Sequence, residues 1–227
     1  MQPYGVVIPA YNAERTLAEA LGSVLNQTVP PAEIVVVDDG STDATAEIAA
    51  RASPLVRVLR QHNTGPGGAT TRGAQAIGAP ILAFLDADDL WLPDKMRLQL
   101  RVLEDDAGVA LVGCRMRQFR HGEADDGTGA VRGGLLRPCV VLRRPVFEAV
   151  GPVIDPPGKR GDMVDWFARL RAGGHRTVEL DQVLALRRIL PGSLSHGRAA
   201  TRDIGYLKVA HLALLRNRRA ASGGDEG

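Results

Sequence analysis

Three aspartates follow directly on an apolar run in FLDADD, residues 84–89. Asp86 and Asp88 are two residues apart, and the preceding PILAFL is typical of a buried strand. Carboxylates this close repel one another, and burial disfavours their charged form. A divalent cation would remove the repulsion, and Mg²⁺ or Mn²⁺ prefers such hard oxygen ligands. The pair therefore predicts a metal site with Asp86 and Asp88 as ligands; the alternative is a solvated turn that begins the next helix.

A second pair of carboxylates stands in DDGSTD, residues 38–43, after the apolar run EIVVV. One aspartate could only cap the helix that follows. The paired aspartates followed by Gly40 favour one side chain, that of Asp39, turning into a cleft. There it could accept a hydrogen bond from a ligand N–H, such as a pyrimidine imide.

A glycine-rich stretch, HNTGPGGATTRG, occupies residues 62–73. It lacks the GK[ST] of a P-loop, and read from Gly65 its sixth residue is Thr70, so it also fails the Rossmann fingerprint. Its backbone N–H groups could still approach a phosphate. Arg72 is the nearest cationic partner in the sequence.

Four short strands alternate with helices in the first half of the chain and would position these clusters. Expected strands are 4–9, 33–39, 55–60 and 80–86, and expected helices are 13–27, 43–52, about 66–78 and 93–104. This alternation predicts an α/β fold with an open, mostly parallel sheet and helices on both faces. Ligands in such sheets bind beyond the carboxyl ends of the strands, where every cluster above is found.

The second half of the chain has a different pattern. We expect strands over 109–119 and 135–144, a polar hairpin or mobile loop over 121–130, helices over 144–151 and 162–174, and one or two strands over 175–190. No linker separates the halves, so we expect one domain over residues 1–220, made of 1–104, 105–198 and a helix over 199–219. Residues 221–227 are expected to be a flexible tail.

Composition excludes several classes of protein. The net charge of +2 indicates no nucleic-acid partner. Cys114 and Cys139 form no CxxC pattern, which favours buried thiols over a disulfide. The N-terminus does not resemble a secretory signal, and no stretch is long and apolar enough to span a membrane, so we expect a cytoplasmic protein. The helix over 199–219 carries arginines at its end; packing on its own domain competes with contact to the inner membrane face or a homodimer.

Four motifs in order, VVIPAYN, EIVVVDDGSTD, N-x-G and FLDADDLWLPDK, resemble those of family 2 glycosyltransferases with the GT-A fold, closely over residues 4–104 and loosely beyond. The resemblance implies that Asp86-Ala87-Asp88 is a DXD motif that holds the metal and the donor diphosphate. It implies that Asp39 and the backbone from Pro9 to Tyr11 hold the nucleobase. The expected donor-binding residues are Pro9, Ala10, Tyr11, Glu14, Asp39, Gly65, Arg72, Asp86, Ala87 and Asp88.

The family inverts the anomeric centre with a carboxylate base from the second half, and the sequence departs from the family there. In GDMVDWFARL, Asp162 falls on the family's Glu and Met163 on the usual catalytic Asp. Asp162 is the first candidate for the base and Asp165, at i+3, the second; the alternative is that both stabilise a helix N-terminus. Leu190-Pro191 replaces a common histidine, with His196 out of register, and Thr70 replaces a common arginine.

These residues predict a metal-dependent, inverting glycosyltransferase that uses a nucleoside-diphosphate sugar, with a UDP-sugar first, and an unknown acceptor. The departures keep open a catalytically inactive nucleotide-sugar-binding or scaffold protein. A nucleotidyltransferase ranks last, because PAYNAERT after the first strand is not the glycine-rich basic loop of that class.

Overall fold

The computed structural model describes residues 1–156 and 161–190, and within them nine strands form one mixed sheet. The strand order is β3-β2-β1-β4-β8-β6-β9-β5, with β7 paired to β6. The strands are β1 Tyr4–Ala10, β2 Glu33–Asp38, β3 Val56–Arg60, β4 Ile81–Phe84, β5 Leu90–Trp91, β6 Leu111–Arg120, β7 Val131–Arg132, β8 Val141–Arg143 and β9 Thr177–Ile189.

The first four strands form the parallel part of the sheet. β1 pairs in parallel with both β2 and β4, and β2 pairs in parallel with β3. All seven residues of β1 are buried, because both faces of the strand are covered. Alternate residues therefore enter opposite cores: Val6 and Ile8 pack in one, and Val7 packs in the other. The expected α/β fold with parallel strands in the first half is confirmed.

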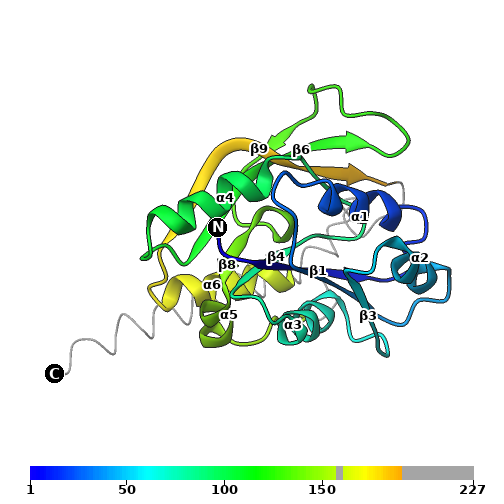
Figure 1. Ribbon diagram of the computed structural model, residues 1–227, viewed down its shortest axis with the longest axis horizontal. Helices are drawn as coiled ribbons and strands as arrows, with labels where there is room; N and C mark the ends of the chain where they lie inside the picture. Colours follow the sequence, from blue (N-terminus) through cyan, green and yellow to red (C-terminus); the bar gives the residue numbers. More distant parts are fainter. Residues whose placement is uncertain (157–160, 191–227) are drawn as a thin grey trace.

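Helices cover both faces of this sheet, as expected (Figure 1). α1, α2 and α4 supply residues to one core, and α3, α5 and α6 supply residues to the other. The helices are α1 Leu17–Leu25, α2 Thr45–Ala52, α3 Pro66–Ala76, α4 Lys95–Asp105, α5 Arg144–Val150 and α6 Asp162–Ala172. α1 and α2 begin later than their apolar periodicity predicts, at Leu17 and Thr45.

The second half extends the sheet with mixed pairing. β8 is antiparallel to β4 and β6, whereas β9 runs parallel to β6 with register shifts near Arg115. The strand expected over 135–144 is wrong in its first part, where a 3-10 turn, η1, spans Arg137–Cys139. Pro138 has no backbone N–H for a sheet ladder, which favours this turn. β5 is too short to predict from periodicity.

Aromatic rings tie α6 to the parallel sheet. Phe84 of β4 lies 6.0 Å from the Phe147 ring, which stacks on Trp166 at 5.6 Å, and Trp166 meets Phe167 edge-on. The Trp166 indole is fully buried, and its Nε1 donates to the Gly151 carbonyl at 2.9 Å. This column of rings fixes the helix whose first residue is Asp162.

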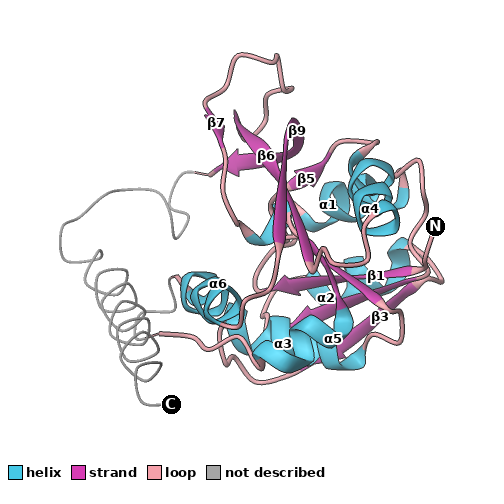
Figure 2. Ribbon diagram, turned by 90° about the vertical axis from the view of Figure 1, so that its left-hand side faces the viewer, coloured by secondary structure: helices cyan, strands magenta, loops and turns pink. Residues whose placement is uncertain are grey.

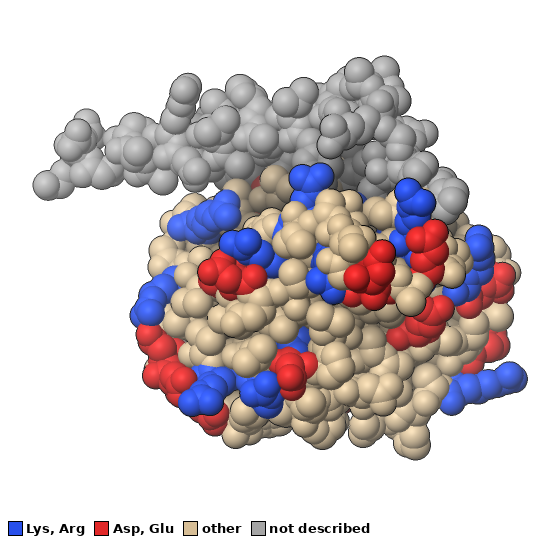
Figure 3. Space-filling view, turned by 90° about the horizontal axis from the view of Figure 1, so that it is seen from above, with Lys and Arg blue, Asp and Glu red and all other residues tan. Residues whose placement is uncertain are grey.

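A hairpin between β6 and β7 projects from the body of the molecule (Figures 1 and 2). It spans the polar residues 121–130, as the sequence predicts. On the face in Figure 3, described Lys and Arg side chains alternate with Asp and Glu, and no patch of one sign dominates that part of the surface. Within the two described ranges, no helix is long and apolar enough to cross a membrane. The helix expected over 199–219 and the tail lie outside the described residues.

Candidate active site

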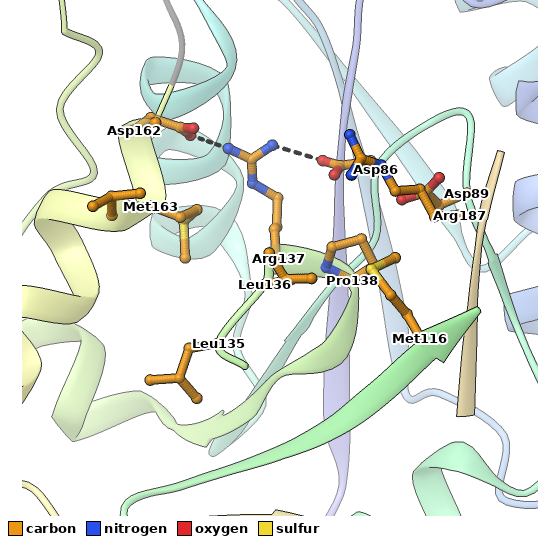
Figure 4. Close-up of a pocket in the computed structure, with 12 residues that line it drawn as sticks. Asp86, Asp89, Met116, Leu135, Leu136, Arg137, Pro138, Asp162, Met163 and Arg187 are labelled. Atoms are coloured by element: carbon orange, nitrogen blue, oxygen red, sulfur yellow. Dashed lines mark hydrogen bonds and ion pairs between the residues drawn. The ribbon is translucent and has the colours of Figure 1, made fainter. Parts of the chain in front are cut away.

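A pocket of about 190 Å³ opens beyond the end of β4, between the two halves of the chain (Figure 4). The turn after β4, strand β6, the segment around η1, the start of α6 and strand β9 all contribute to its wall. Its lining residues are Asp86, Asp89, Met116, Leu135, Leu136, Arg137, Pro138, Gly161, Asp162, Met163, Val164 and Arg187. The expected DXD residue Asp86 and the expected base Asp162 therefore share one pocket.

The aspartates of the β4–β5 turn have different environments. The pKa of Asp88 is raised to about 6, mainly by burial and to a smaller extent by the neighbouring Asp86 carboxylate. Asp89 is fully buried, and its Oδ1 accepts the backbone N–H of Arg188 at 3.0 Å. Burial, followed by the Asp88 and Asp86 charges, raises the pKa of Asp89 well above its ordinary value. Asp89 thus anchors β9 at the wall of the pocket, which Asp86 also lines.

Arg137 joins the two sides of the pocket. Its Nη1 donates to Asp86 Oδ1 at 2.6 Å, and its Nη2 pairs with the Asp162 carboxylate (Figure 4). Burial alone would lower the pKa of Arg137, but the two carboxylates outweigh it and raise the pKa. The guanidinium is the positive charge that lets two carboxylates lie in a buried site.

The two candidate bases are placed differently. Asp162 begins α6, lines the pocket and contacts Arg137. Burial raises the pKa of Asp162, although the Arg137 charge acts in the opposite direction. Asp165 does not line the pocket, and its Oδ2 accepts Arg169 Nε at 3.0 Å, one helical turn later. The geometry favours Asp162 over Asp165 as the base.

The Asp39 carboxylate organises the glycine-rich loop. Asp39 is buried, its Oδ1 accepts the N–H of Thr64 at 2.8 Å, and its Oδ2 accepts that of Gly65 at 2.8 Å. Gly65 has φ +105°, a conformation that favours glycine, and a Cβ there would meet Asp155 Cγ at 2.7 Å. The nucleobase contact of Asp39 stays a prediction, beside a loop-holding role that the sequence did not predict.

The remaining donor-site candidates lie outside the pocket, at the end of β1, near the start of α2 and in the turn after β4. Pro9 and Ala10 are buried at the end of β1, and Tyr11 after them is exposed. Glu14 accepts the backbone N–H of Ala44 at 3.2 Å, beside the start of α2. Ala87, in the turn after β4, is buried. No lining residue of the pocket comes from this group.

The candidate arginines have different roles. Arg72 Nη1 donates to the Arg60 carbonyl at 2.9 Å and to Gln61 at 3.2 Å, so it supports the loop. Arg188 is buried and donates to the Asp88 carbonyl at 2.9 Å and to Glu19 at 2.6 Å. Arg187, by contrast, lines the pocket. Pro191 and His196 lie outside the described residues.

A divalent cation fits this donor set with help from a ligand. No group of three or more His, Cys, Asp or Glu residues that could hold a metal occurs in the described part of the chain. Mg²⁺ commonly takes only one or two carboxylates and completes its shell with phosphate oxygens and water. Asp86, which lines the pocket, and Asp88, which does not, are the two carboxylates available, and burial first and the Asp86 charge second raise the pKa of Asp88. The chemistry available is therefore cation and arginine binding of an anionic group, opposite a carboxylate.

Sequence reasoning did not find Arg137 or Asp155. Arg137 stands in a segment expected to be a strand, where a single arginine carries no motif. Asp155 accepts the N–H groups of Gly67 and Gly68, both at 2.9 Å, and so holds the start of α3. The three nearby glycines of the 62–73 stretch were the available signal that another group approaches closely.

Comparisons with known proteins identify the family of the chain. Residues 5–131 match the sequence model of Glycosyl transferase family 2. Succinoglycan biosynthesis protein ExoU of Rhizobium meliloti is 27% identical over 96% of this chain and 70% of its own length. Uncharacterized glycosyltransferase alr2836 of Nostoc is 41% identical over 44% of this chain and 32% of its own length. The chain thus spans about a third of that relative.

Solved structures show the same fold. S. aureus TarS 1-349 in complex with UDP-GlcNAc has a TM-score of 0.74 at 18% identity, covering 94% of this chain and 66% of TarS. The complex of TarS with UDP has a TM-score of 0.70 at 20% identity, covering 83% of this chain and 61% of TarS. The expected GT-A type fold is confirmed.

Proposed function

The chain belongs to glycosyl transferase family 2, and on that premise we propose that it transfers a sugar from a nucleoside-diphosphate sugar to an acceptor hydroxyl with inversion. The observation that carries the proposal is the pocket in which the DXD residue Asp86 faces the carboxylate of Asp162 across Arg137. A UDP-sugar is the first donor to test, because the similar TarS structures hold UDP and UDP-GlcNAc.

Asp86 and Asp88 would hold Mn²⁺ or Mg²⁺ together with the donor diphosphate. When bound, the cation supplies Lewis-acid stabilisation of the negative charge that develops on the departing diphosphate. Arg187 lines the same pocket and adds positive charge on the β9 side. Asp89 keeps the turn attached to β9 through the Arg188 N–H, which fixes where Asp86 points.

Asp162 would accept the proton of the acceptor hydroxyl. An inverting transfer needs a base on the face of the sugar opposite the diphosphate. Asp162 lies across the pocket from Asp86, on a helix fixed by the buried Trp166. Because burial raises the pKa of Asp162, its carboxylate is a stronger base than an exposed aspartate.

Hydrolysis of nucleotide sugars tests the proposal. We expect the protein to release UDP slowly from one or more UDP-sugars when Mn²⁺ is present, and EDTA to stop the release. Asp88→Ala should abolish metal-dependent UDP binding by calorimetry, because one of two carboxylate ligands is lost. Asp181→Ala is the matched control, since Asp181 is exposed and pairs with Arg115 on the surface.

Two outcomes would contradict parts of the proposal. Metal-dependent UDP-sugar binding without hydrolysis or transfer would favour the alternative, a nucleotide-sugar-binding or scaffold protein, which the Met163 departure motivates. UDP binding that Asp88→Ala leaves unchanged would remove the metal role from the DXD motif. Transfer that survives Asp162→Asn but not Asp165→Asn would move the base to Asp165.

A further inference from the structure

Arg137, for which the sequence predicts no role, contacts a carboxylate on each side of the pocket. Its guanidinium is buried, one terminal nitrogen is held by Asp86 at 2.6 Å, and the other pairs with Asp162. Its Nε is buried and has no hydrogen-bond partner among the described residues. A buried donor without a partner is costly, so this arrangement leaves part of the guanidinium unsatisfied.

The other arginines that could reach a diphosphate are committed elsewhere. Arg72 supports the glycine-rich loop, and Arg188 is buried between the Asp88 carbonyl, Glu19 and the Phe119 ring. Among described cationic residues, only Arg137 and Arg187 line the pocket. Arg137 enters from the opposite side of the pocket to Arg187 and lies next to Asp86 (Figure 4).

A cation at Asp86 and Asp88 would compete with Arg137. The Asp86 Oδ1 atom already accepts Arg137 Nη1 at 2.6 Å, so a divalent ion there would meet a positive charge a few ångströms away. An anionic diphosphate resolves this conflict, because it can accept hydrogen bonds from the guanidinium and ligate the cation at once. Guanidinium groups match phosphate geometry well.

We propose that Arg137 is a diphosphate-binding residue held by Asp86 while the donor is absent. When a metal and a nucleoside diphosphate enter together, Asp86 turns from Arg137 to the metal, and Nη1 of Arg137 donates to the diphosphate. This inference rests on the proposed function. It has a direct consequence: the metal alone binds weakly, and metal and nucleotide strengthen each other's binding.

Calorimetry with MnCl₂ and UDP as separate and combined ligands tests the inference on the full chain. In the wild type, saturating Mn²⁺ should tighten UDP binding about tenfold or more. In Arg137→Gln, Mn²⁺ alone should bind about tenfold tighter, because its competitor at Asp86 is gone. The same variant should bind UDP with Mn²⁺ about 10- to 100-fold more weakly, the range expected for losing a charged hydrogen bond.

Two further variants separate this role from a structural one. Arg137→Lys keeps the charge and should retain weak Mn²⁺ binding while recovering part of the UDP affinity. Arg115→Gln, which removes a surface arginine paired with Asp181, should change neither affinity. Circular dichroism spectra that match the wild type would show that each variant is folded.

The outcomes distinguish this inference from the proposed function. A wild type that binds no UDP with Mn²⁺ overturns both. A wild type that binds UDP with Mn²⁺, together with an Arg137→Gln variant that binds both ligands as tightly as the wild type does, overturns only the role of Arg137. Loss of Mn²⁺ and UDP binding to the same extent in Arg137→Gln also overturns it, because the competition at Asp86 requires opposite changes in the two affinities.

Discussion

The two halves of the chain position their site residues by different means. In residues 4–104, each site cluster follows the end of a parallel strand, so the strand order alone brings the clusters to one edge of the sheet. In residues 105–190, Arg137 stands on a 3-10 turn and Asp162 at the start of a helix that follows an undescribed segment. The alternation of strands and helices positions the site residues of the first half, whereas contacts with the first half position those of the second half.

Three contacts show how the second half depends on the first. Trp91 Nε1 donates to the Pro138 carbonyl at 2.9 Å, and Gln99 Nε2 donates to the Cys139 carbonyl at 2.8 Å. Asp155 holds two N–H groups at the start of α3. The segment that carries Arg137 is therefore fixed by side chains of β5 and α4, which lie some 40 residues earlier in the chain.

Among the residues at the contact between the two halves, removing the Trp166 side chain should have the largest effect on stability. Trp166→Ala deletes a fully buried indole between Phe147 and Phe167, and we expect the free energy of unfolding to fall by about 3–5 kcal/mol. Urea unfolding followed by fluorescence and circular dichroism measures the change. If the chain is one domain, both probes should report one transition.

Leu55→Ala is the control for this experiment. Leu55 is 44% exposed, so its truncation should change stability far less than that of Trp166. A wild type that unfolds in two separate transitions would contradict the single domain expected for residues 1–220 and would show that the halves fold independently.

Lys95 should make stability depend on pH at the boundary between the halves. Lys95 of α4 is fully buried over the Trp91 ring, and burial lowers its pKa from 10.5 to about 8. Between these values the unfolded chain binds a proton that the folded chain does not, so stability should rise from pH 8 to pH 10. The full rise is about 3 kcal/mol, at about 1.4 kcal/mol for each unit of pKa.

Replacing Lys95 with methionine isolates this contribution. Lys95→Met should raise the free energy of unfolding at pH 7 by about 2 kcal/mol, because no charge is then buried. The difference between variant and wild type should shrink as the pH increases to 10. Urea titrations at four pH values measure it, with Arg101→Gln, an exposed arginine of the same helix, as control. A difference that stays constant with pH would contradict a lowered pKa.

The hydrogen bonds of Asp155 should contribute a smaller amount to the stability of the contact between the halves. Asp155→Ala removes the acceptor of two N–H groups at the start of α3, and we expect a loss of about 2 kcal/mol. Asp155→Asn keeps one oxygen and should lose about half as much. Thermal unfolding of the two variants measures the ranking, and equal stability of Asp155→Ala and the wild type would show that this contact does not join the halves.

Two glycines of the first half should respond in opposite directions, and the smallest change of all is expected at Gly22. A Cβ at Gly22 in α1 meets nothing within 4 Å, so Gly22→Ala should stabilise the protein by up to about 1 kcal/mol. A Cβ at Gly65 meets the Asp155 carboxyl at 2.7 Å and the backbone has φ +105°, so Gly65→Ala should destabilise it by about 1–3 kcal/mol. Thermal unfolding measures both changes, and a neutral Gly65→Ala would contradict the close approach.

The sequence predicts the first half well and the second half in part. Apolar runs and helical periodicity place the parallel strands, and the position of Asp86 and Asp88 at a strand end follows from them. Asp162 was predicted as the base from the family pattern around Arg169, although the pattern alone could not separate it from Asp165. Arg137 was missed, because its role depends on two carboxylates that lie 51 and 25 residues away in the chain.

The same physical reason explains why the sequence did not predict the loop contacts of Asp39 and Arg72. Asp39 and Arg72 were expected to face a ligand, and the structure shows that each contacts the 61–65 loop or the strand before it. A polar side chain in a motif can bind a ligand or hold a loop, and only its neighbours in space distinguish the two. Those neighbours belong to segments that are distant in the sequence, and local sequence patterns do not predict which distant segments will pack together.

The projecting hairpin between β6 and β7 offers an attachment point that leaves the pocket intact. Gly122, Glu123 and Ala124 at its tip are exposed, and a Cβ at Gly122 would meet nothing within 4 Å. The segment carrying Arg137 is held by Trp91 and Gln99 rather than by this tip. A short cysteine-containing insertion after Glu123 could therefore carry a fluorophore or bind the protein to a sensor surface, because exposed loop tips tolerate insertion.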